Sequence, residues 1–166
     1  MPVVDIQTAM PRDRTVIEAM MQLYIHDFSE HWAGTPRGEL GEDGQFAPYP
    51  LDPYWRDTGH IPLIMRTGSA LAGFALINPE AHSGLAVDHN MAEFFILRKH
   101  RRGGVGLAAA QAIFARFPGQ WEAAVARRNT AALAFWRRAV ADENDVTEID
   151  VTTEAWDGPV LRFRVG

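Results

Sequence analysis

The chain has 166 residues, a hydrophobic content of 47%, a net charge of −5 and no cysteine. Its length and composition predict one folded domain over residues 1–166, and the lack of cysteine excludes disulfides, thiolate metal sites and a cysteine nucleophile. The acidic balance argues against nucleic-acid binding, and the absence of a signal-like N-terminus or an apolar run of roughly 18 residues predicts a cytoplasmic protein that binds no membrane.

The first half of the chain predicts a helix, a long loop and a hairpin. Apolar residues recur at helical spacing over residues 12–30. Residues 33–60 are rich in Gly, Pro and acidic residues, which indicates a functional loop or one that contains a short helix around residues 51–57. Two apolar runs, residues 61–67 and 70–77, are joined by Gly-Ser and predict a β-hairpin.

The second half alternates strands and helices. The expected elements are a buried strand over 91–97, a helix over 107–117, a strand over 121–126, a helix that follows the N-cap candidate Asn129, and two late strands within 147–153 and 160–165. This order predicts a mixed α/β sheet.

Charge is segregated along the chain. Residues 1–97 carry 13 Asp and Glu but five Arg, whereas residues 98–138 carry nine Lys and Arg and one acidic residue. The basic segment includes the run RKHRRGGVG at residues 98–106, between a predicted strand and a predicted helix. Free N–H groups and the positive dipole end of a helix bind anions, so we expect a compact, multiply charged anion at this turn.

Two nucleotide-binding signatures bear on the turn. The P-loop pattern fails, because Leu107 and Ala108 stand where Lys and Ser or Thr are required. The dinucleotide pattern G-x-G-x-x-A is present at residues 104–109, and Arg127 and Arg128 could meet a 2′-phosphate. An NADP-binding oxidoreductase is therefore one alternative, although few residues remain for further βα units.

Two segments carry a family resemblance. The run Arg101 to Gly106 fits R-x-x-G-x-G, and NTAALAFWRRA fits N-x-x-A-x-x-F followed by Trp136 in place of Tyr. Together they resemble the GCN5-related N-acetyltransferase (GNAT) superfamily. YIHDFSE, DGQF and LDPYW are similar to segments of a bacterial group of uncharacterised predicted acetyltransferases within it.

The resemblance implies a mostly antiparallel sheet flanked by helices, with a pyrophosphate site in the strand–turn–helix segment, and acetyl-CoA as acyl donor. The implied cofactor-binding residues are Ile96, Leu97, Arg98, Arg101, Arg102, Gly103, Gly104, Val105, Gly106, Asn129 and Trp136. It also implies direct transfer of an acetyl group to a small-molecule or peptide amine. Many relatives form dimers, so a homodimer through the late strands is expected.

Catalysis of amine acetylation needs a base and a polarised carbonyl. Glu93 is the candidate base, and a backbone N–H near Ile96 or Leu97 is the candidate carbonyl donor. An indole is too weak an acid to replace the usual Tyr, so either the thiolate leaves unassisted, or another Tyr supplies the proton, or the chain is a non-catalytic acyl-CoA-binding module.

The amine site is expected on the first helix and the long loop, where carboxylates and aromatic rings suit a cation. Its candidate residues are Tyr24, Asp27, His31, Tyr54 and Trp55. The six histidines show no paired ligand spacing, so no metal is predicted.

Overall fold

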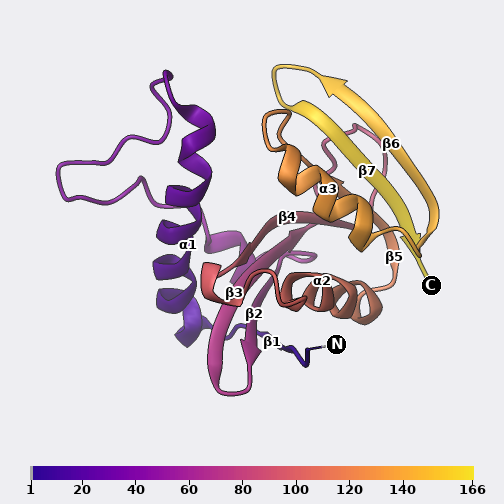
Figure 1. Ribbon diagram of the computed structural model, residues 1–166, viewed down its shortest axis with the longest axis horizontal. Helices are drawn as coiled ribbons and strands as arrows, with labels where there is room; N and C mark the ends of the chain where they lie inside the picture. Colours follow the sequence, from indigo (N-terminus) through magenta and orange to yellow (C-terminus); the bar gives the residue numbers. More distant parts are fainter. Residues whose placement is uncertain (1) are drawn as a thin grey trace.

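A seven-stranded sheet in the order β1-β2-β3-β4-β5-β7-β6 forms the centre of the computed structural model, which describes residues 2–166 (Figure 1). β4 and β5 are parallel and the other neighbouring strands are antiparallel, which confirms the expected mostly antiparallel sheet. The strands are β1 Asp5–Thr8, β2 Ile61–Thr67, β3 Ala70–Asn78, β4 His89–Ile96, β5 Gly119–Ala124, β6 Asn144–Thr152 and β7 Asp157–Val165.

Three α-helices flank the sheet. They are α1 Arg14–Ser29, α2 Val105–Arg116 and α3 Thr130–Ala139, and short 3₁₀ turns lie at η1 Pro11–Asp13, η2 Glu30–Trp32, η3 Asp52–Trp55 and η4 Arg98–His100. The predicted helices, hairpin and late strands are confirmed, and η3 is the short helix expected within the long loop. None of the helices formed by residues 2–166 has the length and apolar character of a membrane span.

β1 was not predicted. It has four residues, three of them exposed, and lies at the edge of the sheet beside β2. A strand this short has too little apolar alternation to be seen in the sequence. Arg116 of α2 ties it to the fold by donating to the Ile6 carbonyl and to the Thr8 hydroxyl, each at 2.9 Å.

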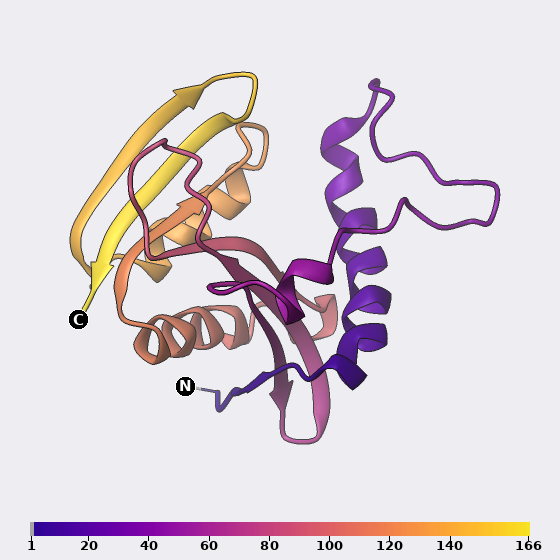
Figure 2. The same cartoon turned by 180° about the vertical axis from the view of Figure 1, so that it is seen from behind.

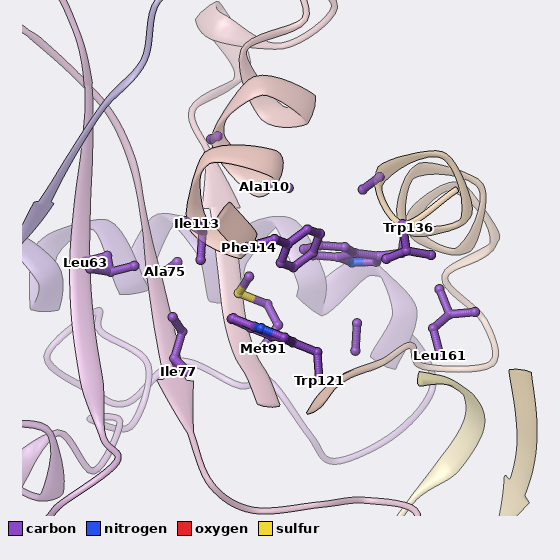
Figure 3. Packing of buried hydrophobic residues seen from close by; sticks show 14 of the residues in the cluster. Leu63, Ala75, Ile77, Met91, Ala110, Ile113, Phe114, Trp121, Trp136 and Leu161 are labelled. Atoms are coloured by element: carbon purple, nitrogen blue, oxygen red, sulfur yellow. The ribbon is translucent and has the colours of Figure 1, made fainter. Parts of the chain in front are cut away.

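Alternate residues of β3 face two separate apolar clusters, because successive side chains of a strand point to opposite faces. Phe74 and Leu76 pack with residues of α1, whereas Ala75 and Ile77 pack on the side of α2 and α3. Figure 3 shows this second cluster, in which Phe114, Trp121 and Trp136 lie close together. Phe114 is fully buried, with its ring centroid 5.1 Å from that of Trp121. The two clusters fix α1 against one face of the sheet and α2 against the other.

β4 and β5 separate soon after they meet. Their pairing is confined to His89 with Trp121 and Asn90 with Glu122. β3, in contrast, stays paired with β4 as far as Ile96. Figures 1 and 2 show α3 and the β6–β7 hairpin on the far side of this divergence from α1. The second half of β4 therefore keeps one backbone edge without a strand partner.

Candidate functional site

A basic turn joins β4 to α2. Gly104 caps the helix with φ 82°, in the left-handed region that favours glycine. A Cβ on Gly106 would lie 3.2 Å from the Phe135 ring, so glycine here permits close approach of α3. The first N–H groups of a 12-residue helix have no partners within the helix and carry its positive dipole end. The turn therefore offers an anion both backbone donors and positive charge.

A first cavity, of about 580 Å³, opens over this turn, and we call it the glycine-turn cavity. Among the residues expected to bind the acyl donor, those that line it are Ile96, Arg98, Arg101, Arg102, Gly104, Gly106, Asn129 and Trp136. Leu97, Gly103 and Val105 lie outside its lining. The Asn129 side chain also accepts from the Ala132 N–H at 3.1 Å, which confirms its expected role as the N-cap of α3.

Asp27, which the sequence analysis groups with the amine-binding candidates, lines this same cavity. Its carboxylate pairs with Arg98 at 2.6 Å and with Arg101 at 2.5 Å. Burial alone would raise the pKa of Asp27, but hydrogen bonds from the two arginines lower it below its usual range. Asp27 thus partly neutralises two arginines that an incoming anion would contact.

The open edge of β4 supplies unpaired backbone groups. The Leu97 N–H donates to the Ala72 carbonyl of β3 at 2.8 Å. Alternate residues of an antiparallel strand direct their N–H groups to opposite sides, so the N–H groups of Phe94 and Ile96 face the gap between β4 and β5. Leu97 therefore cannot polarise a carbonyl in that gap, whereas Phe94 or Ile96 can. The Ile96 carbonyl accepts from Arg101 Nε at 2.8 Å.

A second cavity, of about 620 Å³, lies on the other side of the gap and contains Glu93; we call it the Glu93 cavity. Aromatic side chains from six segments form much of its wall, and Glu39 and Glu80 add carboxylates. The aromatic lining residues are Tyr24, Phe28, Trp32, Phe46, Tyr49, Phe94, Trp136 and Trp156. Arg37 lies 4.6 Å from the centroid of the Trp32 ring, so one ring of this wall already holds a cation on its face.

Glu93 is half-buried at the wall of this cavity. Burial raises its pKa to about 8, and a hydrogen bond with Tyr24 only partly opposes this shift. Burial and the neighbouring Glu93 in turn hold the pKa of the Tyr24 hydroxyl well above its usual range. A carboxyl group that titrates near neutral pH beside a cavity is well suited to exchange protons with a ligand.

Two anchors hold the loops of the Glu93 cavity. Gln22 of α1 exchanges two hydrogen bonds with the Phe46 backbone, at 2.8 and 3.1 Å, and so fixes the long loop. Glu122, fully buried, forms an ion pair with Arg162 and accepts from the N–H groups of His82 and Ser83. The loop before β4 is thereby held where His82 packs on Trp156, with ring centroids 4.5 Å apart.

The three remaining residues predicted to bind the amine do not lie together in the structure. His31 lines the glycine-turn cavity, and its carbonyl accepts from Arg128 at 3.1 Å. Tyr54 and Trp55 line neither cavity. Tyr54 is buried, and the Trp55 indole donates to the Ala9 carbonyl at 3.0 Å. The structure therefore gives Tyr54 and Trp55 packing roles away from both cavities.

Sequence reasoning missed Phe46, Tyr49, Glu80, His82 and Trp156. These residues come from the long loop, the β3–β4 loop and the β6–β7 turn, which only tertiary packing brings together. The richness of the long loop in aromatic residues was a usable signal for Phe46 and Tyr49; no comparable local pattern surrounds the others. Within residues 2–166, no group of three or more His, Asp or Glu side chains is arranged to hold a metal ion.

The sheet topology can be compared with the one that a dinucleotide-binding domain requires. A doubly wound domain needs successive parallel strands, and the sheet has one parallel pair. Arg127 forms exposed ion pairs with Asp150 and Asp157, each at 2.9 Å. The sheet therefore lacks the topology that the NADP-binding alternative requires.

Several solved structures share the fold. An acetyltransferase from Thermus thermophilus superposes with a TM-score of 0.65 at 15% identity, covering 97% of this chain and 95% of that one. AAC(6′)-Ib in complex with paromomycin and acetyl-CoA gives 0.66 at 11%, covering 97% and 93%. A chimera of the spermidine N-acetyltransferase SpeG from Vibrio cholerae and hSSAT gives 0.57 at 10%, covering 98% and 94%.

No curated protein matches the sequence significantly. The sequence model of the Acetyltransferase (GNAT) family, in contrast, matches residues 17–140, a segment that runs from α1 through the basic turn to the end of α3. The chain therefore belongs to the acetyltransferase (GNAT) family.

Proposed function

We propose that this acetyltransferase transfers the acetyl group of acetyl-CoA directly to a primary amine. One observation carries the proposal: the two cavities meet along the open edge of β4 and share part of their walls. The shared lining residues are Tyr24, Phe28, Phe94, Asn129, Ala132 and Trp136. A donor in one cavity and an acceptor in the other would bring their reacting atoms together at this junction.

The glycine-turn cavity fits acetyl-CoA, the donor that the family uses. The N–H groups of α2 and the side chains of Arg98, Arg101 and Arg102 suit a pyrophosphate. The unpaired edge of β4 suits an amide-bearing arm that lies along it as a further strand would. Acetyl-CoA supplies an activated thioester; this chain supplies the positioning.

The Glu93 cavity fits an amine. Its carboxylates and aromatic faces attract an ammonium ion, and the pKa of His82 is lowered by burial, which keeps its ring neutral at pH 7. Aminoglycoside and spermidine acetyltransferases share the fold, and both act on amines. We therefore propose a cationic amine with an apolar body, either a small molecule or a peptide side chain.

Glu93 is the proposed base. An alkyl ammonium has a pKa near 10 and must lose a proton before it attacks. Glu93 lines the amine side and not the donor side of the junction, which is where that proton leaves. The N–H of Phe94 or Ile96 would stabilise the negative charge that develops on the thioester oxygen.

Turnover tests the proposal directly. Acetyl-CoA is mixed with a panel of primary amines (benzylamine, spermidine and a lysine-containing peptide), and release of the CoA thiol is followed. The proposal predicts amine-dependent thiol release and an acetylated product with one added acetyl group. Acetyl-CoA binding without turnover on a wide amine panel would instead support the acyl-CoA-binding module.

A further inference from the structure

A proton must reach the departing sulfur, and Trp136 stands where the family resemblance places a Tyr. Trp136 is buried, with its ring centroid 5.1 Å from that of Phe94 and 5.0 Å from that of Phe135. Its indole N–H is far too weak an acid to protonate a thiolate. Any proton donor must therefore come from another element.

The junction of the two cavities limits the choice. Three of its six lining residues, Phe28, Phe94 and Ala132, have no acidic proton in the side chain. The amide of Asn129 and the indole of Trp136 do not ionise in proteins. Tyr24 alone among the six carries a Brønsted acid into the space that both cavities share.

Packing holds the Tyr24 ring in place. Its centroid lies 5.9 Å from that of Phe74, at an interplanar angle of 89°, and 5.7 Å from that of Phe95. Phe74 and Phe95 belong to adjacent strands, so α1 presents the ring to the sheet at a fixed position. The hydroxyl has the Glu93 carboxyl as its hydrogen-bond partner.

We infer that Tyr24 is a further catalytic residue of the proposed reaction and donates the proton to the leaving CoA sulfur. The inference rests on the proposed function, with Glu93 as base. The ammonium gives one proton to the Glu93 carboxylate, and the free amine attacks the thioester carbon to form the C–N bond. As the C–S bond breaks, its electron pair goes to sulfur, and sulfur takes the Tyr24 hydroxyl proton. Tyr24 recovers a proton from Glu93, and the remaining excess proton on nitrogen leaves to solvent.

The proton affinities of the three groups agree with this relay. Glu93 has a pKa of about 8, and a simple thiol has one of about 8.5, so transfer between them is nearly balanced. The high pKa of Tyr24 prevents it from ionising on its own. Tyr24 can therefore pass a proton without holding a charge.

The test compares Tyr24→Phe with a matched variant, Tyr54→Phe. Each removes one tyrosine hydroxyl from a ring of the same apolar cluster, but Tyr54 lines neither cavity. Tyr24→Phe should lower kcat about a hundredfold and leave the acetyl-CoA dissociation constant within about twofold, because its ring remains; Tyr54→Phe should keep kcat.

A poorer leaving group separates proton donation from packing. The oxygen-ester analogue of acetyl-CoA releases an alkoxide, which needs protonation more than a thiolate does. The kcat defect of Tyr24→Phe should therefore grow at least tenfold with this donor. An active wild type with full kcat in Tyr24→Phe, or with an equal defect for both donors, would overturn this inference and leave the proposed function intact. A wild type inactive on the whole amine panel would contradict the proposed function itself.

Discussion

The two cavities are built in different ways. The glycine-turn cavity takes its glycines and three of its arginines from one continuous segment, residues 96–106. The Glu93 cavity is assembled from α1, the long loop, β4, the end of β5, α3, the β3–β4 loop and the β6–β7 turn. The glycine-turn cavity can therefore be predicted from a short sequence segment, whereas the Glu93 cavity is formed only by tertiary packing. Changes on the two sides should therefore affect different kinetic constants.

The largest effect is expected on the Glu93 side. Glu93→Gln keeps the shape of the side chain but removes the proposed base, so kcat should fall by about 10²- to 10³-fold. The acetyl-CoA dissociation constant should stay within about twofold, because Glu93 does not line the glycine-turn cavity. Steady-state kinetics and a binding titration on the same preparation measure both. Wild-type turnover in this variant would remove Glu93 from the mechanism.

The pH dependence of kcat/KM should differ from that of acetyl-CoA affinity. Glu93 accepts a proton only when ionised, and its pKa is raised to about 8. Below that pH the ionised fraction falls, so kcat/KM should decrease about tenfold per pH unit, and above it the dependence on Glu93 should level off. Acetyl-CoA affinity should not follow this limb. A profile that is unchanged in Glu93→Gln and follows only the pKa of the amine would contradict the assignment.

On the donor side, Arg101→Ala should weaken acetyl-CoA binding. Hydrogen bonds to charged groups contribute about 1.5–3 kcal/mol, which corresponds to about a ten- to hundredfold rise in the dissociation constant. The loss should shrink at high salt, because screening weakens the phosphate contact. Titrations at two ionic strengths test this. Glu122→Gln is the control at the other cavity. It alters the loop anchor of the Glu93 cavity and should leave acetyl-CoA affinity near that of the wild type.

The smallest expected effect has the opposite sign. Asp27 holds Arg98 and Arg101 through two ion pairs and competes with an incoming phosphate for them. Asp27→Asn keeps the side-chain size and removes the charge, so acetyl-CoA should bind about three- to tenfold more tightly. The same titration measures it. Weaker binding would show that Asp27 positions the arginines instead of competing for them.

The sequence predicted the local features well. The strand, glycine turn and helix of residues 89–116, and the Asn129 cap, follow from apolar periodicity, glycine conformation and side-chain capping, which all act over a few residues. It grouped Asp27, Tyr54 and Trp55 in one site from their residue types, whereas partners far away in the sequence hold Asp27 at the glycine-turn cavity and Trp55 outside both cavities. It missed β1 because an edge strand of four residues depends on its neighbour and not on its own pattern.

A thermal-shift titration of the wild type and Arg101→Ala with acetyl-CoA, with NADPH as the comparison ligand, would show whether the glycine-turn cavity binds the acyl donor. A ligand at about 100 times its dissociation constant stabilises the folded protein by roughly 2.7 kcal/mol, which corresponds to a shift of several degrees for a chain of this length. We expect this shift for the wild type with acetyl-CoA, a smaller one for Arg101→Ala at the same concentration, and none with NADPH. No shift with acetyl-CoA would contradict the assignment of the glycine-turn cavity as the donor site.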